Sequence, residues 1–137
     1  MDMQSKPHIL YVEDEIRSRR VMQMVTSDLD LPAVTLFEDR TDFLERALAL
    51  SPKPDLIFLD IHMKPYTGFQ LLEMLRASGS FDNVPIVAMT ASVMNEEIQE
   101  LRTAGFDGCV AKPIDFDSFP EILNRIMSGE KVWRILG

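Results

Sequence analysis

Short apolar runs alternate along the chain with longer segments in which apolar residues recur at helical spacing. Each run is bounded by charged or turn-forming residues, a pattern typical of strands that are buried on both faces of a sheet. The expected strands cover residues 8–12, 33–37, 55–59, 84–89 and 108–111. The expected helices cover about residues 15–29, 40–50, 66–77, 93–104 and 115–128.

Five alternations of strand and helix predict an α/β protein, because neighbouring parallel strands need a crossover and the crossover is usually a helix. The second strand is expected at an edge of the sheet. Asp39 or Asp42 is expected to begin the second helix, Asp115 to begin the fifth, and Gly105 to end the fourth. The sequence has no internal repeat or linker that would divide its 137 residues, so we expect one domain.

The composition narrows the classes of function. A hydrophobic content of 46% is enough for one well-filled core, and a net charge of -8 argues against binding to nucleic acid or an anionic membrane. No apolar segment approaches the roughly 20 residues that span a bilayer, so we expect a soluble cytoplasmic protein. Cys109, the only cysteine, cannot form an internal disulfide, and His8 and His62 are too few for a zinc cluster.

Polar residues follow four of the expected strands at the point where each strand ends. Because ligands of open parallel sheets gather outside the carboxyl ends of the strands, these residues are candidates for a common site. In chain order they are Glu13, Asp14, Glu15, Asp60, Thr90 and Lys112.

The chemistry of these side chains suits a phosphoryl group. Bringing Glu13, Asp14 and Asp60 together would raise the pKa of at least one carboxyl unless a cation intervenes. Oxygen ligands favour Mg²⁺, which typically takes one or two carboxylates and keeps several waters. Lys112 adds a fixed positive charge and Thr90 a hydroxyl, so the set predicts a phosphoryl site with Asp60 as a possible covalent acceptor.

Four stretches at these positions, "ILYVEDE", "LIFLDIHMKPYTGFQLL", "VPIVAMTAS" and "GFDGCVAKPI", resemble the receiver domains of two-component response regulators. The resemblance covers about residues 7–128 and leaves 129–137 as a C-terminal tail of a single receiver domain over residues 1–137. It implies a flavodoxin-like (βα)5 fold, a doubly wound parallel sheet in a three-layer sandwich with strand order 2-1-3-4-5.

The resemblance also implies a magnesium site. Asp14 would bind Mg²⁺ directly, Asp60 would be both a ligand and the phosphoacceptor, and the backbone carbonyl of His62 would complete the protein ligands. Glu13 would act mainly through a metal-bound water.

Two further residues would contact the phosphoryl oxygens, namely Thr90 and Lys112, and the Lys112–Pro113 bond is expected to be cis. The implied function is that of a signalling module, not an enzyme, which takes a phosphoryl group from a phosphohistidine of a sensor histidine kinase or histidine phosphotransfer protein. It would act on a downstream protein target by contact, as a monomer or weak homodimer. The first helix resembles the family's surface for the donor at Ile16, Arg17, Arg20 and Val21.

Some positions depart from the family's pattern. Lys64 separates Met63 from Pro65, although Gly68 keeps its usual distance from the acceptor, so a reshaped loop is expected in place of a shifted helix. Cys109 stands where the family usually has Tyr or Phe, which questions the usual aromatic switch.

Three alternatives compete with this interpretation. The departures at Lys64 and Cys109 leave open a receiver-like interaction module that works without phosphorylation. A haloacid-dehalogenase phosphatase would need a second acid two residues after the nucleophile, where this chain has His62. A flavin carrier is disfavoured because the acidic "EDE" after the first strand would repel a phosphate.

The tail carries an apolar group that is unsuited to free exposure in water. We expect it to fold back on the domain in preference to forming a dimer or partner contact. Its apolar residues are Val132, Trp133, Ile135 and Leu136.

Overall fold

The structure, a computed structural model, describes residues 7–31, 34–92 and 94–135. The strands are β1 (Ile9–Val12), β2 (Val34–Phe37), β3 (Leu56–Asp60), β4 (Ile86–Thr90), β5 (Gly108–Ala111) and β6 (Val132–Ile135). The helices are α1 (Ile16–Asp28), α2 (Phe43–Leu48), α3 (Gly68–Ser78), α4 (Asn95–Ala104) and α5 (Phe119–Met127). Three residues of the sequence predictions lie outside the described residues. They are Ala33 and Val93, which belong to expected elements, and Leu136, which belongs to the expected tail contact.

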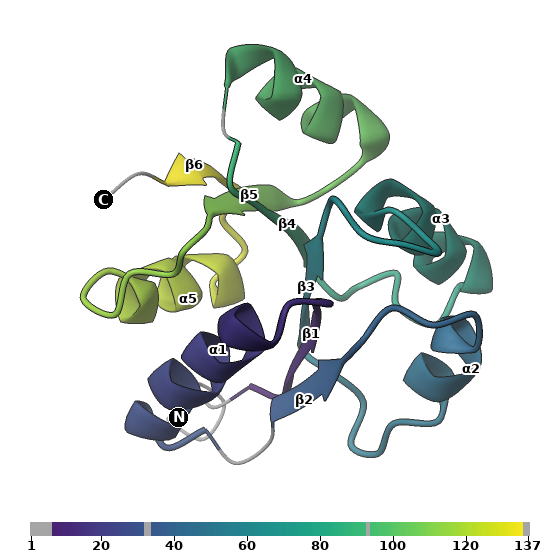
Figure 1. Cartoon of the computed structure of the whole chain (residues 1–137), viewed down its shortest axis with the longest axis horizontal. Helices are drawn as coiled ribbons and strands as arrows, with labels where there is room; N and C mark the ends of the chain where they lie inside the picture. The colour runs from purple at the N-terminus through teal and green to yellow at the C-terminus, as the bar shows by residue number, and fades with distance from the viewer. Residues whose placement is uncertain (1–6, 32–33, 93, 136–137) are drawn as a thin grey trace.

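The strands form one parallel sheet in the order β2-β1-β3-β4-β5-β6. Helices α1 and α5 cover one face, and α2, α3 and α4 cover the other (Figure 1). This arrangement confirms the flavodoxin-like sandwich, the strand order 2-1-3-4-5 and the edge position of β2. The sixth strand was not expected from the sequence.

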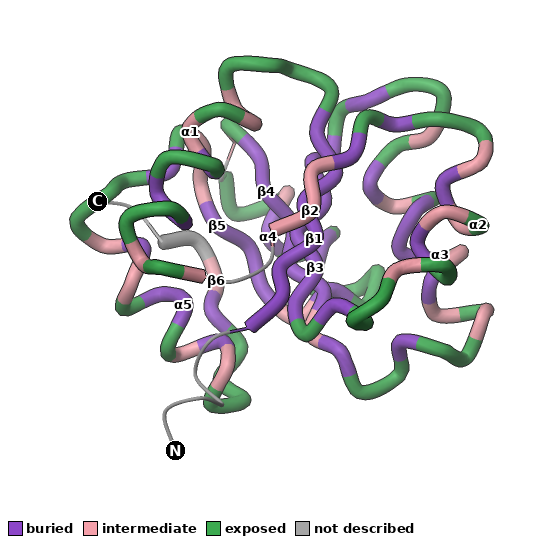
Figure 2. The backbone as a smooth tube through the Cα atoms, turned by 90° about the horizontal axis from the view of Figure 1, so that it is seen from below, coloured by how far each residue is buried: buried purple, intermediate pink, exposed green. Residues whose placement is uncertain are grey.

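Both faces of the sheet are buried, which explains why the strands are almost continuously apolar. Side chains alternate along β1: Leu10 and Val12 join the core beneath α2, α3 and α4, whereas Ile9 and Tyr11 join the core beneath α1 and α5. β1, β3 and β4 are buried along their whole length (Figure 2). The residues at the carboxyl ends of these three strands are therefore anchored by buried structure.

The predicted helix ends are partly correct. Gly105 ends α4 with a φ of 106°, and Asp42 directly precedes α2. The expectation that Asp115 begins α5 was wrong, because the helix begins at Phe119. A helix starting at residue 115 would place Pro120 in its interior, where the ring clashes with a carbonyl of the preceding turn, whereas the first turn tolerates proline.

The C-terminal segment folds back on the domain, as the sequence predicted. β6 pairs in parallel with β5, Val132 is only 1% exposed, and Trp133 packs against the core beneath α2, α3 and α4. Throughout the described residues 7–31, 34–92 and 94–135, no helix has both the length and the apolar character of a membrane span.

Candidate functional site

The carboxyl ends of β1, β3, β4 and β5 meet at one end of the sheet and border a cavity of about 400 Å³. The residues that line it are Glu13, Asp14, Glu15, Asp60, His62, Ala91 and Lys112. Thr90, the last residue of β4, is buried and lines a smaller adjoining cavity of about 40 Å³ together with His62 and Ser92. All the site residues predicted from the sequence therefore lie around this end of the sheet.

Lys112 forms the centre of the charge network. Its Nζ lies 2.9 Å from Glu13 Oε1 and 3.1 Å from Asp60 Oδ1, and its side chain is 17% exposed. Burial lowers the pKa of Lys112, but hydrogen bonds and charge interactions with Glu13 and Asp60 outweigh that effect and raise the pKa above its ordinary value. The side chain therefore remains an ammonium ion at neutral pH.

Asp60 ends β3 and is 5% exposed. Burial, followed by the negative charge of Glu13, raises the pKa of Asp60, and Lys112 opposes the shift, so that the pKa rises from 3.8 to about 6. The ionised form of the Asp60 carboxyl is thus energetically disfavoured in the folded protein, and additional positive charge near it would reduce this penalty.

Glu13 is fully engaged by its neighbours and is 1% exposed. Its Oε1 accepts hydrogen bonds from the Tyr11 hydroxyl at 2.6 Å and from Lys112, while Oε2 accepts one from the backbone N–H of Glu15 at 3.2 Å. Burial, followed by the charge of Glu13, raises the pKa of Tyr11. Sequence reasoning missed Tyr11, although its position two residues before Glu13 places both side chains on one side of the strand.

Asp14 is exposed, and its Oδ1 accepts a hydrogen bond from the backbone N–H of Asp39 at 2.8 Å. Asp39 is 6% exposed, and its Oδ2 accepts a hydrogen bond from the backbone N–H of Tyr66 at 2.8 Å. Burial raises the pKa of Asp39, and the bond from Tyr66 opposes the shift. Asp39, considered in the sequence as a helix start, instead links Asp14 to the loop that follows β3.

The loop between β3 and α3 is shaped by close backbone contacts. Gly68 donates its N–H to Ile61 O at 3.0 Å, and a Cβ at Gly68 would lie 2.5 Å from Asp60 O, so only glycine fits. The Lys64–Pro65 bond within the loop is cis, and α3 begins at Gly68. The side chain of His62 is exposed.

Thr90 connects the site to the segment that enters α4. Its Oγ1 accepts a hydrogen bond from the backbone N–H of Ser92 at 3.1 Å, and its carbonyl accepts one from the N–H of Lys112 at 2.9 Å. The Lys112–Pro113 bond is cis, as expected.

The donor set suits a hard cation that keeps water ligands. Within the part of the chain that the structure describes, no three Asp, Glu, His or Cys side chains are arranged to hold a metal ion by themselves. Asp14, Asp60 and His62 nevertheless line the same cavity. Two carboxylates, one carbonyl and several waters are an environment that Mg²⁺ accepts.

Comparisons with known proteins identify the family. The sequence model of the response regulator receiver domain matches residues 9–124. The chain is 33% identical over 131 residues to the nitrate/nitrite response regulator protein homolog of Haemophilus influenzae, covering 95% of this chain and 61% of the relative. It is 33% identical over 120 residues to the transcription factor SKN7 of Chaetomium thermophilum, covering 88% of this chain and 15% of the relative.

A solved structure supports the same assignment. The chemotaxis response regulator CheY4 of Vibrio cholerae superposes with a TM-score of 0.77 at 25% identity, covering 87% of this chain and 97% of that protein. The chain belongs to the family of response regulator receiver domains and has the CheY-like form of that domain. Members of this family are signalling modules of two-component systems. The chain spans less than two thirds of the two curated relatives named above.

Proposed function

We propose that the chain acts as a single receiver domain that accepts a phosphoryl group on Asp60 from a phosphohistidine of a sensor kinase or phosphotransfer protein. The observation that carries this proposal is the placement of Asp60 Oδ1 3.1 Å from the Lys112 ammonium, beside an acid-lined cavity. A carboxylate oxygen of Asp60 attacks phosphorus, the bond from phosphorus to the donor imidazole nitrogen breaks, and the electron pair leaves with the imidazole. The product is an aspartyl phosphate.

Asp14, Asp60 and the carbonyl of His62 would hold Mg²⁺ in this cavity. The ion supplies positive charge that offsets the negative charge of the transferring group. Glu13 already accepts hydrogen bonds from Lys112 and Tyr11, which supports the proposal that it would contact the ion through a metal-bound water and not directly.

Lys112 and Thr90 would receive the phosphoryl oxygens. Lys112 is charged and already oriented by Glu13 and Asp60, so it offers an N–H donor without a large rearrangement. The Thr90 hydroxyl, which accepts from the N–H of Ser92, has its own proton to donate.

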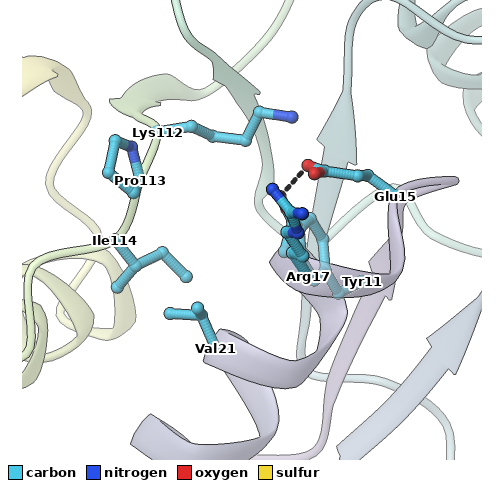
Figure 3. A pocket seen from close by; sticks show the side chains of 8 residues that line it. Tyr11, Glu15, Arg17, Val21, Lys112, Pro113 and Ile114 are labelled. Carbon is cyan, nitrogen blue, oxygen red and sulfur yellow. Dashed lines mark hydrogen bonds between the residues drawn. The ribbon is translucent and has the colours of Figure 1, made fainter.

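The donor would dock against α1. An apolar pocket of about 200 Å³ lies between α1 and the segment after β5, and Val21 faces Ile114 across it while Lys112 lies on its rim (Figure 3). Ile16, at the start of α1, is 51% exposed. Apolar side chains around a phosphohistidine could pack here, and the signal would leave by contact with a downstream protein.

The test is incubation with Mg²⁺ and acetyl phosphate, followed by intact mass measurement. We expect one added phosphoryl group on the wild-type chain, none on Asp60→Asn, and none when the metal is chelated. Asp82→Asn is the matched control, because Asp82 is an exposed aspartate outside the cavity. Failure of the folded wild-type protein to label would instead favour a module that works without phosphorylation.

A further inference from the structure

β6 lies beyond the part of the chain that the family model matches, which ends at residue 124. The turn leading to it is well defined: Gly129 has a φ of 97°, and the N–H of Glu130 donates to Arg125 O at 3.0 Å. Arg125 Nε donates back to Glu130 Oε2 at 3.0 Å. The C-terminus of α5 therefore directs the chain along β5.

β5 is shaped to receive this strand. A Cβ at Gly108 would lie 2.5 Å from the carbonyl oxygen and 3.2 Å from the nitrogen of Val132, so a larger residue at position 108 would push β6 away. Val132 is 1% exposed and belongs to the core beneath α1 and α5. β6 is consequently a part of the packed domain.

Trp133 connects β6 to α4. It is paired with Cys109 across the two strands, and paired side chains project to the same face of a sheet. On that face Trp133 packs against the core beneath α2, α3 and α4. The guanidinium carbon of Arg102, in the last turn of α4, lies 4.7 Å from the centre of the Trp133 ring, within the range of a cation–π interaction.

The other end of α4 is connected to the candidate site. The Ser92 N–H that donates to Thr90 Oγ1 lies in the loop before α4, and Met94 O accepts the hydrogen bond from the N–H of Ile98 in the first turns of the helix. If a phosphoryl group on Asp60 draws the Thr90 hydroxyl toward it, Ser92 is drawn along, because its N–H donates to the same oxygen. α4 is thus connected to the candidate site at its N-terminal end and to β6 at its C-terminal end.

We propose that β6 is a clamp on α4, closed in the unphosphorylated protein by the Trp133–Arg102 contact and loosened when Asp60 carries a phosphoryl group. This inference rests on the proposed function. Because coupling between two sites is reciprocal, opening the clamp must also favour the phosphorylated state of the site.

Trp133 is the only tryptophan of the chain, so its fluorescence reports on the clamp directly. The probe is beryllofluoride with Mg²⁺, and ¹⁹F NMR records separately whether it binds. We expect acrylamide to quench Trp133 more strongly after beryllofluoride binds, and no change in Asp60→Asn. Bound beryllofluoride with unchanged quenching overturns the clamp alone. Absence of bound beryllofluoride in the wild-type protein overturns the proposed function and the clamp with it.

The reciprocal effect is measured with Arg102→Ala, which removes the cation and leaves the site untouched. We expect this variant to bind beryllofluoride about 5-fold more tightly, at the lower end of usual coupling strengths. Gln99→Ala, at an exposed position of the same helix, is the control and should bind as the wild type does. Equal affinity of Arg102→Ala and wild type would overturn the clamp.

Discussion

The ammonium nitrogen of Lys112 lies 3.1 Å from Asp60 Oδ1 while it also lies 2.9 Å from Glu13 Oε1. One half-buried cation is therefore paired with two buried carboxylates, and the two carboxylates together are left with excess negative charge. Burial and this imbalance together raise the pKa of Asp60, and the excess negative charge attracts further positive charge to the cavity.

Replacement of Asp60 by Asn should stabilise the metal-free protein. The folded-state pKa of Asp60 is about 6 and the ordinary value is 3.8, so the folded protein disfavours the charged form as pH rises through this window. Asp60→Asn should unfold at higher urea concentration than wild type above pH 6, and this difference should vanish near pH 3.8. The comparison is made in chelator, with Asp82→Asn as the surface control. A variant that is less stable than wild type above pH 6 would contradict the charge imbalance.

Replacement of Lys112 by Met should have the opposite effect, because Glu13 and Asp60 would lose their shared cation. Breaking a buried ion pair costs about 3 kcal/mol or more at neutral pH. The loss should shrink at acidic pH, where Asp60 takes up a proton and needs no partner. Urea unfolding at neutral pH and at acidic pH measures how the loss of stability depends on pH. Lys112→Arg, which keeps the charge, should recover part of the stability. A uniform loss across the pH range would instead point to packing alone.

Asp39 should matter for phosphorylation although it lies outside the cavity lining. Asp39→Ala leaves the Tyr66 N–H without its acceptor, at a cost of about 1–3 kcal/mol, and frees the loop that follows Asp60 and carries the His62 carbonyl. We expect slower labelling at limiting Mg²⁺, with recovery at saturating Mg²⁺. Asp39→Asn retains an acceptor oxygen and should restore most of the rate. If Asp39→Ala is labelled at the wild-type rate under limiting Mg²⁺, Asp39 does not support phosphorylation by holding this loop.

Removal of the residues after Ser128 should destabilise the domain. The deletion exposes the surfaces that Val132 and Trp133 cover, and losing one buried valine alone costs about 1.5–3 kcal/mol. Thermal melting measures the loss, and Lys131→Ala, at an exposed position, is the matched control. Unchanged stability together with a change in self-association would mean that the tail serves an interface between chains.

Much of the fold and site could be predicted from the sequence because the topology of a parallel sheet decides which residues meet. Asp60, Thr90 and Lys112 each follow an apolar run, and the carboxyl ends of such runs share one end of the sheet. The link between Asp14 and Asp39 could not be predicted in the same way. It depends on the register in which Val12 pairs with Phe37, and apolar runs alone leave that register open.

β6 was missed for a different reason. Its four residues follow a short turn, and no further helix comes after them in the pattern, so the alternation that identifies the other strands is lacking. The apolar character of Val132 and Trp133 indicated burial, but the partner surface depends on the absence of a side chain at Gly108. The late start of α5 similarly depends on Pro120, which the first turn of a helix tolerates and the interior of a helix does not.

The most direct test of the account is to locate the phosphoryl group within the chain. After labelling with acetyl phosphate and Mg²⁺, borohydride reduces an aspartyl phosphate to homoserine, which tandem mass spectrometry assigns to a single position. The account predicts homoserine at position 60 and at no other aspartate. Homoserine at position 14 or 39, or a folded protein without homoserine, would contradict it.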